Sequence, residues 1–551
     1  MNKKIYSFAM MALLAFGGAT PLVAQETEEV VATSEEATEQ PEKFQGLEFD
    51  VPPLEPKHKL VCDDYMNNMF LDPEKANKSL QRLLRSIQRK PQALVAVGHY
   101  FVTNSTSEIS YYGPAKMCSD KAYETPDATK EYVLMFCMET AMLGRDYGNA
   151  GRFCDVLLSQ NEGHLPALKL KARIYKLLNP VVAIEALELI KKYEPSYYMA
   201  DKELGDIHYE YAEKAEGAQL VKDLKAACGF YKNYFAAVPN TKDAIEYRAA
   251  LRYSYSLFTA QMMMPESNPD KATFLKECQE LTTKVLDLNL ASDANRAKPF
   301  KAYKFFCDVD AGDLDASLAS SAYIANKEYA DSLYTYLDYL YAAKFEESME
   351  NKSGAVEYYK MGLALDSTKA PGFKAVADLY RQLGQPALGI EYYEKYLKLI
   401  GKEKNLGDEL GLANLYLAAS NKCDSTQVEL RDKYKNDADM IYQGIADEMS
   451  APENEGKYDA SLFYLPWYYR AQLWITNPAA AEEKPKMYYE KALELIGENE
   501  KLNRQKEICA QYLMLYYFKT NNDAECMKYL ETVILVNPNN RVASQILEVL
   551  M

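Results

Sequence analysis

The same amphipathic phrase occurs twice in this chain, 34 residues apart. The two copies are AVEYYKMGLAL, which begins at Ala355, and GIEYYEKYLKL, which begins at Gly389. Their apolar residues follow helical spacing, and a second apolar-periodic stretch and a short polar turn precede each copy. The repeated unit is therefore a helix, a tight turn and a second helix. Two short helices cannot bury their apolar faces alone, so the copies must stack to form a continuous core.

The repeated unit resembles the tetratricopeptide repeat. In that family the first helix has an aromatic residue or Leu early and a small residue in its middle, and Gly occupies the turn. The second copy matches the pattern at Phe373, Ala377, Tyr380, Gly384, Gly389 and Tyr393. It departs at Tyr396 and Gly401, where Ala and Pro are usual. The resemblance implies an all-α fold, namely a right-handed α-solenoid of stacked antiparallel helix pairs.

Weaker copies of the second-helix phrase occur elsewhere, as AIEALELIKKYEP, ACGFYKNYFAAVP and CMKYLETVILVNP. The turns between them differ in length, so the repeats are irregular. We expect residues 57–125 to be helical, either as diverged repeats or as a cap. We then expect irregular repeats over 126–330, well-matched repeats over 331–404 and C-terminal repeats over 405–551.

The first 24 residues have the pattern of a cleavable signal peptide. Lys3 and Lys4 precede an apolar run that Pro21 ends, and a cut is expected after Ala24. The run is too short to cross a bilayer, and the alternative is a buried N-terminal helix. We therefore predict export, to the periplasm or as a secreted protein.

Residues 25–56 are predicted to be a disordered acidic tether. The stretch over 25–43 contains seven Glu and no aromatic residue. Such a composition cannot bury enough apolar surface to offset the entropy of ordering the chain. A solvated helix is the alternative that this composition also permits.

The formal net charge of the whole chain is −17. A surface of this sign repels phosphate backbones and anionic lipid heads, so nucleic-acid binding is not expected. No later stretch is apolar for 18 residues either, so we expect no direct membrane insertion. The ten Cys include no C-x-x-C pair, which argues against a zinc site and against a small disulfide scaffold.

Two cysteines are placed on facing sides of one helix pair by the repeat register. These are Cys137 and Cys154. Export would permit a disulfide between them. The alternative, two buried thiols that act as small apolar residues, is the favoured interpretation.

No arrangement of residues in the sequence indicates catalysis. The four His occur in no metal-binding frame, and neither a phosphate-binding loop nor a G-x-S-x-G nucleophile motif is present. Acidic pairs are numerous because 80 residues are acidic, and solvated helix faces account for them. We therefore predict that the protein is not an enzyme and has no metal or cofactor.

The resemblance also implies where a partner would bind. In this family the first helices line the concave side of the array and bind peptides or protein segments. By this register Tyr336 and Tyr339 of one unit and Lys374 and Arg381 of the next form a partner-binding groove. The predicted function is a non-catalytic protein–protein interaction scaffold of the cell envelope.

A second function is compatible with the same composition. Exported helical glycan-binding proteins of the SusD-like kind also contain tetratricopeptide-like units and bind sugars on aromatic platforms. The segment that holds Trp467 and Trp474 could form such a platform, although a buried aromatic core is favoured. The absence of a lipoprotein Cys after the signal-like segment opposes the glycan hypothesis.

Overall fold

The structure is a computed structural model that describes residues 46–550 except 266, 292 and 476–480. The predicted signal peptide lies outside the described residues, as does the tether up to residue 45. The chain divides at Gly312 into two compact units. We call residues 46–312 the N-terminal unit and residues 313–550 the C-terminal unit, and each is described by itself.

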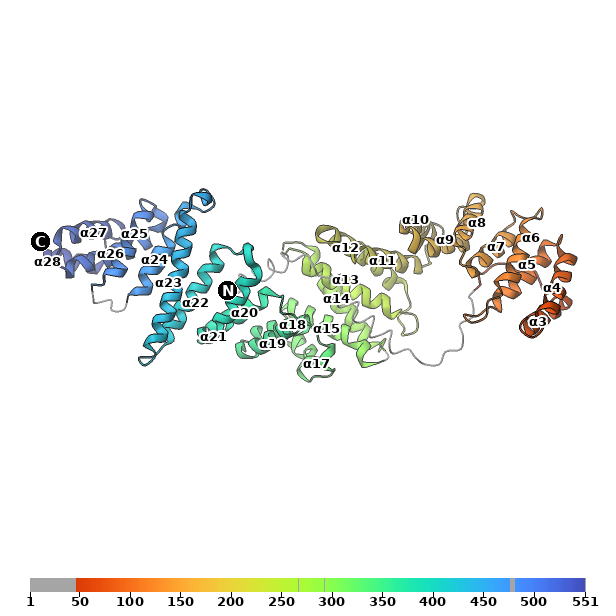
Figure 1. Ribbon diagram of the computed structural model, residues 1–551, viewed down its shortest axis with the longest axis horizontal. Coiled ribbons are helices and arrows are strands. Elements are labelled where there is room, and N and C mark those ends of the chain that lie inside the picture. The colour runs from red at the N-terminus through yellow and green to blue at the C-terminus, as the bar shows by residue number, and fades with distance from the viewer. Residues whose placement is uncertain (1–45, 266, 292, 476–480, 551) are drawn as a thin grey trace. The chain divides into compact units, whose positions relative to one another are not determined.

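The N-terminal unit is built of helices that pack in sequential order (Figure 1). They are α3 (Pro56–Asn68), α4 (Pro73–Ile87), α5 (Pro91–Thr103), α6 (Tyr112–Tyr123), α7 (Glu131–Leu143), α8 (Tyr147–Gln160), α9 (Leu165–Leu178), α10 (Pro180–Tyr193), α11 (Met199–Ala212), α12 (Gly217–Ala237), α13 (Tyr247–Met263), α14 (Asp270–Asp287) and α15 (Ala294–Ala311). Several begin at Pro, which suits the first helical position because its missing N–H has no intrahelical partner there.

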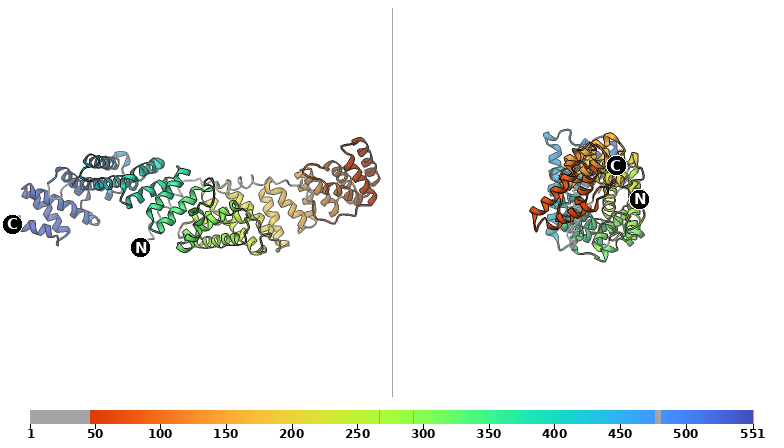
Figure 2. Two further views of the ribbon diagram at one scale, coloured as in Figure 1. Left: turned by 90° about the horizontal axis from the view of Figure 1, so that it is seen from below. Right: turned by 90° about the vertical axis from the view of Figure 1, so that its right-hand side faces the viewer.

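The C-terminal unit repeats the same construction, seen from two further directions in Figure 2. Its α-helices are α16 (Leu314–Ser320), α17 (Ala322–Ala325), α18 (Tyr336–Ser348), α19 (Lys352–Leu365), α20 (Ala370–Gln382), α21 (Pro386–Ile400), α22 (Leu406–Lys422), α23 (Val428–Ser450), α24 (Leu465–Trp474), α25 (Glu483–Ile496), α26 (Asn503–Lys519), α27 (Asp523–Val536) and α28 (Arg541–Leu550). Short 3-10 turns are η1 (Asp331–Leu333), η2 (Gly401–Glu403), η3 (Pro452–Asn454), η4 (Ala460–Leu462) and η5 (Glu500–Leu502).

The 34-residue repeat appears directly in the helix boundaries. Helices α18 and α20 begin 34 residues apart, and so do α19 and α21. Each pair is joined by a tight turn that contains one left-handed residue, Glu350 with φ 60° in the first copy and Gly384 with φ 73° in the second. The all-α solenoid of helix pairs that was predicted from the sequence is confirmed. Among the described residues, no helix is both long and apolar enough to cross a membrane.

Tyrosine supplies many of the contacts between successive helices. The hydroxyl of Tyr396 donates to the Asp408 carboxylate over 2.7 Å, and Tyr231 donates to Asp206 over 2.7 Å. A buried carboxylate needs hydrogen-bond donors, and a phenol supplies one from a large ring that also fills the core. This acidic chain uses the pairing repeatedly, so packing between helices explains why it contains as many as 45 Tyr.

The predicted tether is shorter than expected at its C-terminal end. Residues 46–55 have no helix or strand, yet Leu47, Phe49 and Leu54 pack against the core of the N-terminal unit. The segment docks because, unlike the glutamate-rich stretch before it, it carries large apolar side chains. The tether prediction is therefore wrong for residues 46–55.

Candidate functional site

One face of helix α20 carries three charged side chains that stay partly exposed. Lys374, Asp378 and Arg381 are spaced four and three residues apart, so they share a face of the helix. Their side chains are 32%, 42% and 52% exposed, respectively. Arg381 lies 3.5 Å from the Asp378 carboxylate. The opposite face of α20, with Phe373 and Val376, is buried in the core.

Lys374 also connects α20 to α22, which is the first helix of the next helix pair. Its Nζ donates to Oδ1 of Asp408 over 2.8 Å, and Tyr396 donates to the same oxygen. Asp408 is 4% exposed and forms a capping box with Asn405 at the start of α22. Burial raises the pKa of Asp408, but the hydrogen bonds from Lys374 and Tyr396 outweigh that effect and hold the pKa below its ordinary value. Lys374 therefore contributes both to the exposed face of α20 and to the packing of two successive helix pairs.

The two predicted tyrosines lie deeper than the cations. Tyr336 is half-buried and packs against Gly362 and Gly372, and burial raises its pKa. Tyr339 is 7% exposed, and its ring centroid lies 5.8 Å from that of Tyr334. The structure thus brings Lys374 and Arg381 to one surface, while the two rings pack between helices. Binding by the predicted set stays a prediction.

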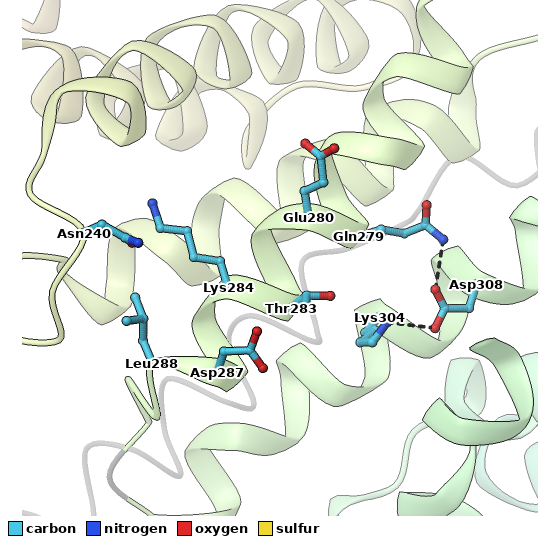
Figure 3. Close-up of a pocket in the computed structure, with 9 residues that line it drawn as sticks. All are labelled: Asn240, Gln279, Glu280, Thr283, Lys284, Asp287, Leu288, Lys304 and Asp308. Carbon is cyan, nitrogen blue, oxygen red and sulfur yellow. Dashed lines mark hydrogen bonds and ion pairs between the residues drawn. The ribbon is translucent and has the colours of Figure 1, made fainter.

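An open polar cavity lies on α14 and α15 of the N-terminal unit (Figure 3). Its volume is about 530 Å³. At one end the buried Asp308 accepts hydrogen bonds from Gln279 over 2.9 Å and from Lys304 over 3.2 Å. At the other end Lys284 extends towards Asn240. Acidic and basic groups are mixed, which suits a polar contact surface more than a reaction centre.

The two Trp rings do not form an open platform in the described structure. Trp467 packs with Tyr488, and the guanidinium of Arg470 lies 5.1 Å from the Trp467 centroid. Nζ of Lys484 lies 3.1 Å from the Trp474 centroid. A cation of the same chain therefore lies against each Trp ring. These contacts favour a packed aromatic cluster over an open sugar-binding platform.

Cys137 and Cys154 are buried free thiols in the structure. Sγ of Cys137 lies 3.9 Å from the carbonyl oxygen of Ser119, whereas Sγ of Cys154 lies 3.3 Å from Sδ of Met138. The two sulfurs have different neighbours, so the structure contains the buried-thiol alternative. Burial raises the pKa of Cys137 to about 11 and that of Cys154 to about 12.

Sequence reasoning missed a buried polar pair in the N-terminal unit. Glu139 on α7 is fully buried, and its Oε2 shares a hydrogen bond of 2.7 Å with Nδ1 of His99 on α5. The available signal was the position of Glu139, the only charged residue in the largely apolar stretch VLMFCMETAML. The partner on α5 could not be found from spacing, because the two residues come from different helix pairs.

No protein-family model matches the sequence, and a search of curated proteins finds none similar to it. Solved structures show weak likenesses. The C-terminal part of a TPR repeat-containing protein from Cytophaga hutchinsonii has 17% identity and a TM-score of 0.37, over 54% of this chain and 98% of that one. A chain of the APC/C hetero-tetramer Cut9-Hcn1 has 12% identity and a TM-score of 0.22, over 90% and 97%. A chain of Naa15/Naa10 bound to HypK-THB has 11% identity and a TM-score of 0.25, over 90% and 96%. With scores this low, the fold assignment rests on the helix pairs of the chain itself.

Proposed function

We propose that this protein is a non-catalytic scaffold that binds a segment of another protein. The binding surface lies in the C-terminal unit and is formed by the first helix of each helix pair, of which α20 is one. The observation that carries the proposal is the charged face of α20. Lys374, Asp378 and Arg381 remain partly exposed there, while the other faces of the helix pack against its neighbours. Arginine is enriched among residues that dominate protein interfaces, because its planar head group makes several directed hydrogen bonds.

The mixed charge of this face indicates the chemistry of the segment. Arg381 lies 3.5 Å from the Asp378 carboxylate, which is long for a hydrogen bond. The guanidinium of Arg381 is therefore able to donate hydrogen bonds to an acidic group of a partner. Asp378 would then accept a donor from the same segment. Tyr336 is half-buried at the start of α18, and the exposed part of its ring would add an apolar contact to the same segment. The proposed ligand is therefore an extended segment that carries both acidic and donor groups.

We also propose that the scaffold works outside the cytoplasm, in the periplasm or as a secreted protein. Support comes from the sequence of residues 1–24 alone. Cleavage after Ala24 can be checked by N-terminal sequencing of the protein purified from its own cells. An intact N-terminus beginning at Met1 would contradict this part of the proposal.

Site-specific photo-crosslinking tests the binding surface even though the partner is unidentified. A photoreactive phenylalanine analogue replaces Arg381 in the full chain, which is then irradiated in its native cells. The matched control places the same analogue at Glu391, a residue of the second helix α21 that is 71% exposed. A discrete protein adduct at position 381 and none at 391 is the expected result. Equal labelling at both positions, or none at 381, would overturn the proposed surface.

A further inference from the structure

The chain segment 46–54 lies on the N-terminal unit as a docked peptide would. Along residues 46–51 the side chains alternate between exposed and half-buried. Leu47, Phe49 and Val51 are half-buried, whereas Glu48 and Asp50 are exposed. This period of two is that of an extended chain with one face on a surface. We call residues 46–54 the docked segment.

A buried carboxylate binds the backbone of the docked segment. The amide N–H of Leu47 donates to Oε1 of Glu139 over 2.9 Å. Glu139 is fully buried, and its other oxygen is hydrogen-bonded to His99. A buried carboxylate oxygen without a donor is costly, so the site requires an N–H at this point. The contact uses the main chain and therefore accepts any extended segment that fits around it.

Two side-chain requirements give the site its selectivity. A Cβ at Gly46 would collide with Oε1 of Glu139, so a larger residue there would force the Glu139 carboxylate, which is also hydrogen-bonded to His99, to move. Three positions later, the ring of Phe49 stands edge-on to His99, with centroids 5.5 Å apart and an interplanar angle of 82°. Leu47 packs against the apolar core between these two contacts. The fit describes a pattern of glycine, an apolar residue, a variable residue and an aromatic residue.

We propose that α5 and α7 form a peptide-binding site for an extended Gly-Leu-x-Phe segment, and that the chain's own residues 46–54 occupy it as an intramolecular ligand. Main-chain hydrogen bonding gives affinity and alternate side-chain contacts give specificity, which is a common way for proteins to bind extended peptides. The partner is a protein segment with this pattern, and it must displace the docked segment to bind. The site is separate from the charged face of α20, so either proposal can fail alone.

Opening the site in the full-length protein tests this directly. Gly46→Val removes the close approach, and Leu47→Asp places a second carboxylate beside Glu139; both changes lie outside the helices. The probe is a fluorescent, N-terminally acetylated peptide of residues 46–55. Fluorescence anisotropy should show it binding to both opened variants at least about tenfold more tightly than to the wild type, whose own segment acts at a high effective concentration.

Matched peptides and hydrogen exchange decide the outcome. Peptides carrying Gly46→Val or Phe49→Ala should bind the opened variants about tenfold more weakly, because each removes one contact of the site. Exchange at the amide of residue 47 should be slow in the wild type and fast in both variants. The proposal is overturned if the opened variants do not bind the peptide. It is also overturned if all three peptides bind alike, or if the amide of residue 47 remains protected in both variants.

Discussion

Gly389 of α21 lies so close to Ala377 of α20 that a Cβ at position 389 would come within 2.8 Å of the Ala377 carbonyl oxygen. The contact is between two backbones, so no flexible side chain can move aside to relieve it. This relationship explains why small residues recur at these places in the repeat. The two helices of a pair cross at positions where both carry small residues. The aromatic rings on either side of the crossing then fill the core.

Replacing Gly389 should therefore destabilise the C-terminal unit. Gly389→Ala introduces the clash with Ala377, and overpacking of this kind costs about 1–3 kcal/mol. Gly444→Ala in α23 is the matched control, because nothing lies within 4 Å of a Cβ there. The control should be neutral or more stable by up to about 1 kcal/mol, since Ala favours a helix over Gly. Urea unfolding of both variants measures the difference, and equal stabilities would contradict the helix crossing.

Asp408 should make the stability of the C-terminal unit depend on acid. The folded pKa of Asp408 is lowered, so the carboxylate contributes stability at neutral pH, and this contribution is lost as the pH falls below the ordinary value of 3.8. Asp408→Asn should cost about 1.5–3 kcal/mol near neutral pH, because Lys374 loses a charged partner. The cost should shrink in acid. The exposed control Glu391→Gln should change stability little at either pH. A cost for Asp408→Asn that persists in strong acid would contradict the assignment.

The cysteines should differ sharply in reactivity. In the described structure nine of the ten are buried, and Cys423 alone is partly exposed. Burial raises the pKa of Cys62 and Cys509 to about 12, which leaves little reactive thiolate at mildly alkaline pH. Iodoacetamide should label Cys423 of the native protein first, as read by peptide mass spectrometry. After denaturation without a reductant, Cys137 and Cys154 should both be alkylated. A peptide pair joined through these two residues would instead show a disulfide.

The parts of the fold that depend on local pattern could be predicted from the sequence. The 34-residue phrase predicts the two helix pairs α18–α19 and α20–α21 and the tight turn inside each pair, because one amphipathic unit contains that information. The division at Gly312 could not be predicted, since it depends on which helices contact one another over long distances. The docked segment was missed because its few apolar residues follow a long acidic stretch, and average composition conceals their alternation.

The candidate site was predictable to a smaller extent. Helical spacing places Lys374 and Arg381 on one exposed face, as the structure shows. The same spacing cannot give the direction of a ring, and Tyr339 turns inward against Tyr334. Glu139 and His99 come from separate helix pairs, so their contact follows from stacking and from no local motif.

The largest single effect on the N-terminal unit is expected from Asp206. Its carboxylate, 2% exposed, accepts from Tyr231 over 2.7 Å and lies within 3.1 Å of Lys202 and 3.0 Å of Arg252. Burial raises the pKa of Asp206, but the charges of Lys202 and Arg252 outweigh burial and lower it. Asp206→Asn keeps the shape and removes the charge that balances these cations, so it should cost about 3–5 kcal/mol.

The matched control is Asp155→Asn, which breaks an ion pair of 2.8 Å with Lys171 at a carboxylate that is 56% exposed. Exposed pairs contribute little, so the control should change stability by less than about 1 kcal/mol. Hydrogen exchange in α11 to α13 measures both variants within the same unit. Faster exchange there for Asp206→Asn, with Asp155→Asn like the wild type, is the expected result. If both variants exchange alike, the buried carboxylate does not hold α11, α12 and α13 together, and the aromatic packing between these helices must be sufficient.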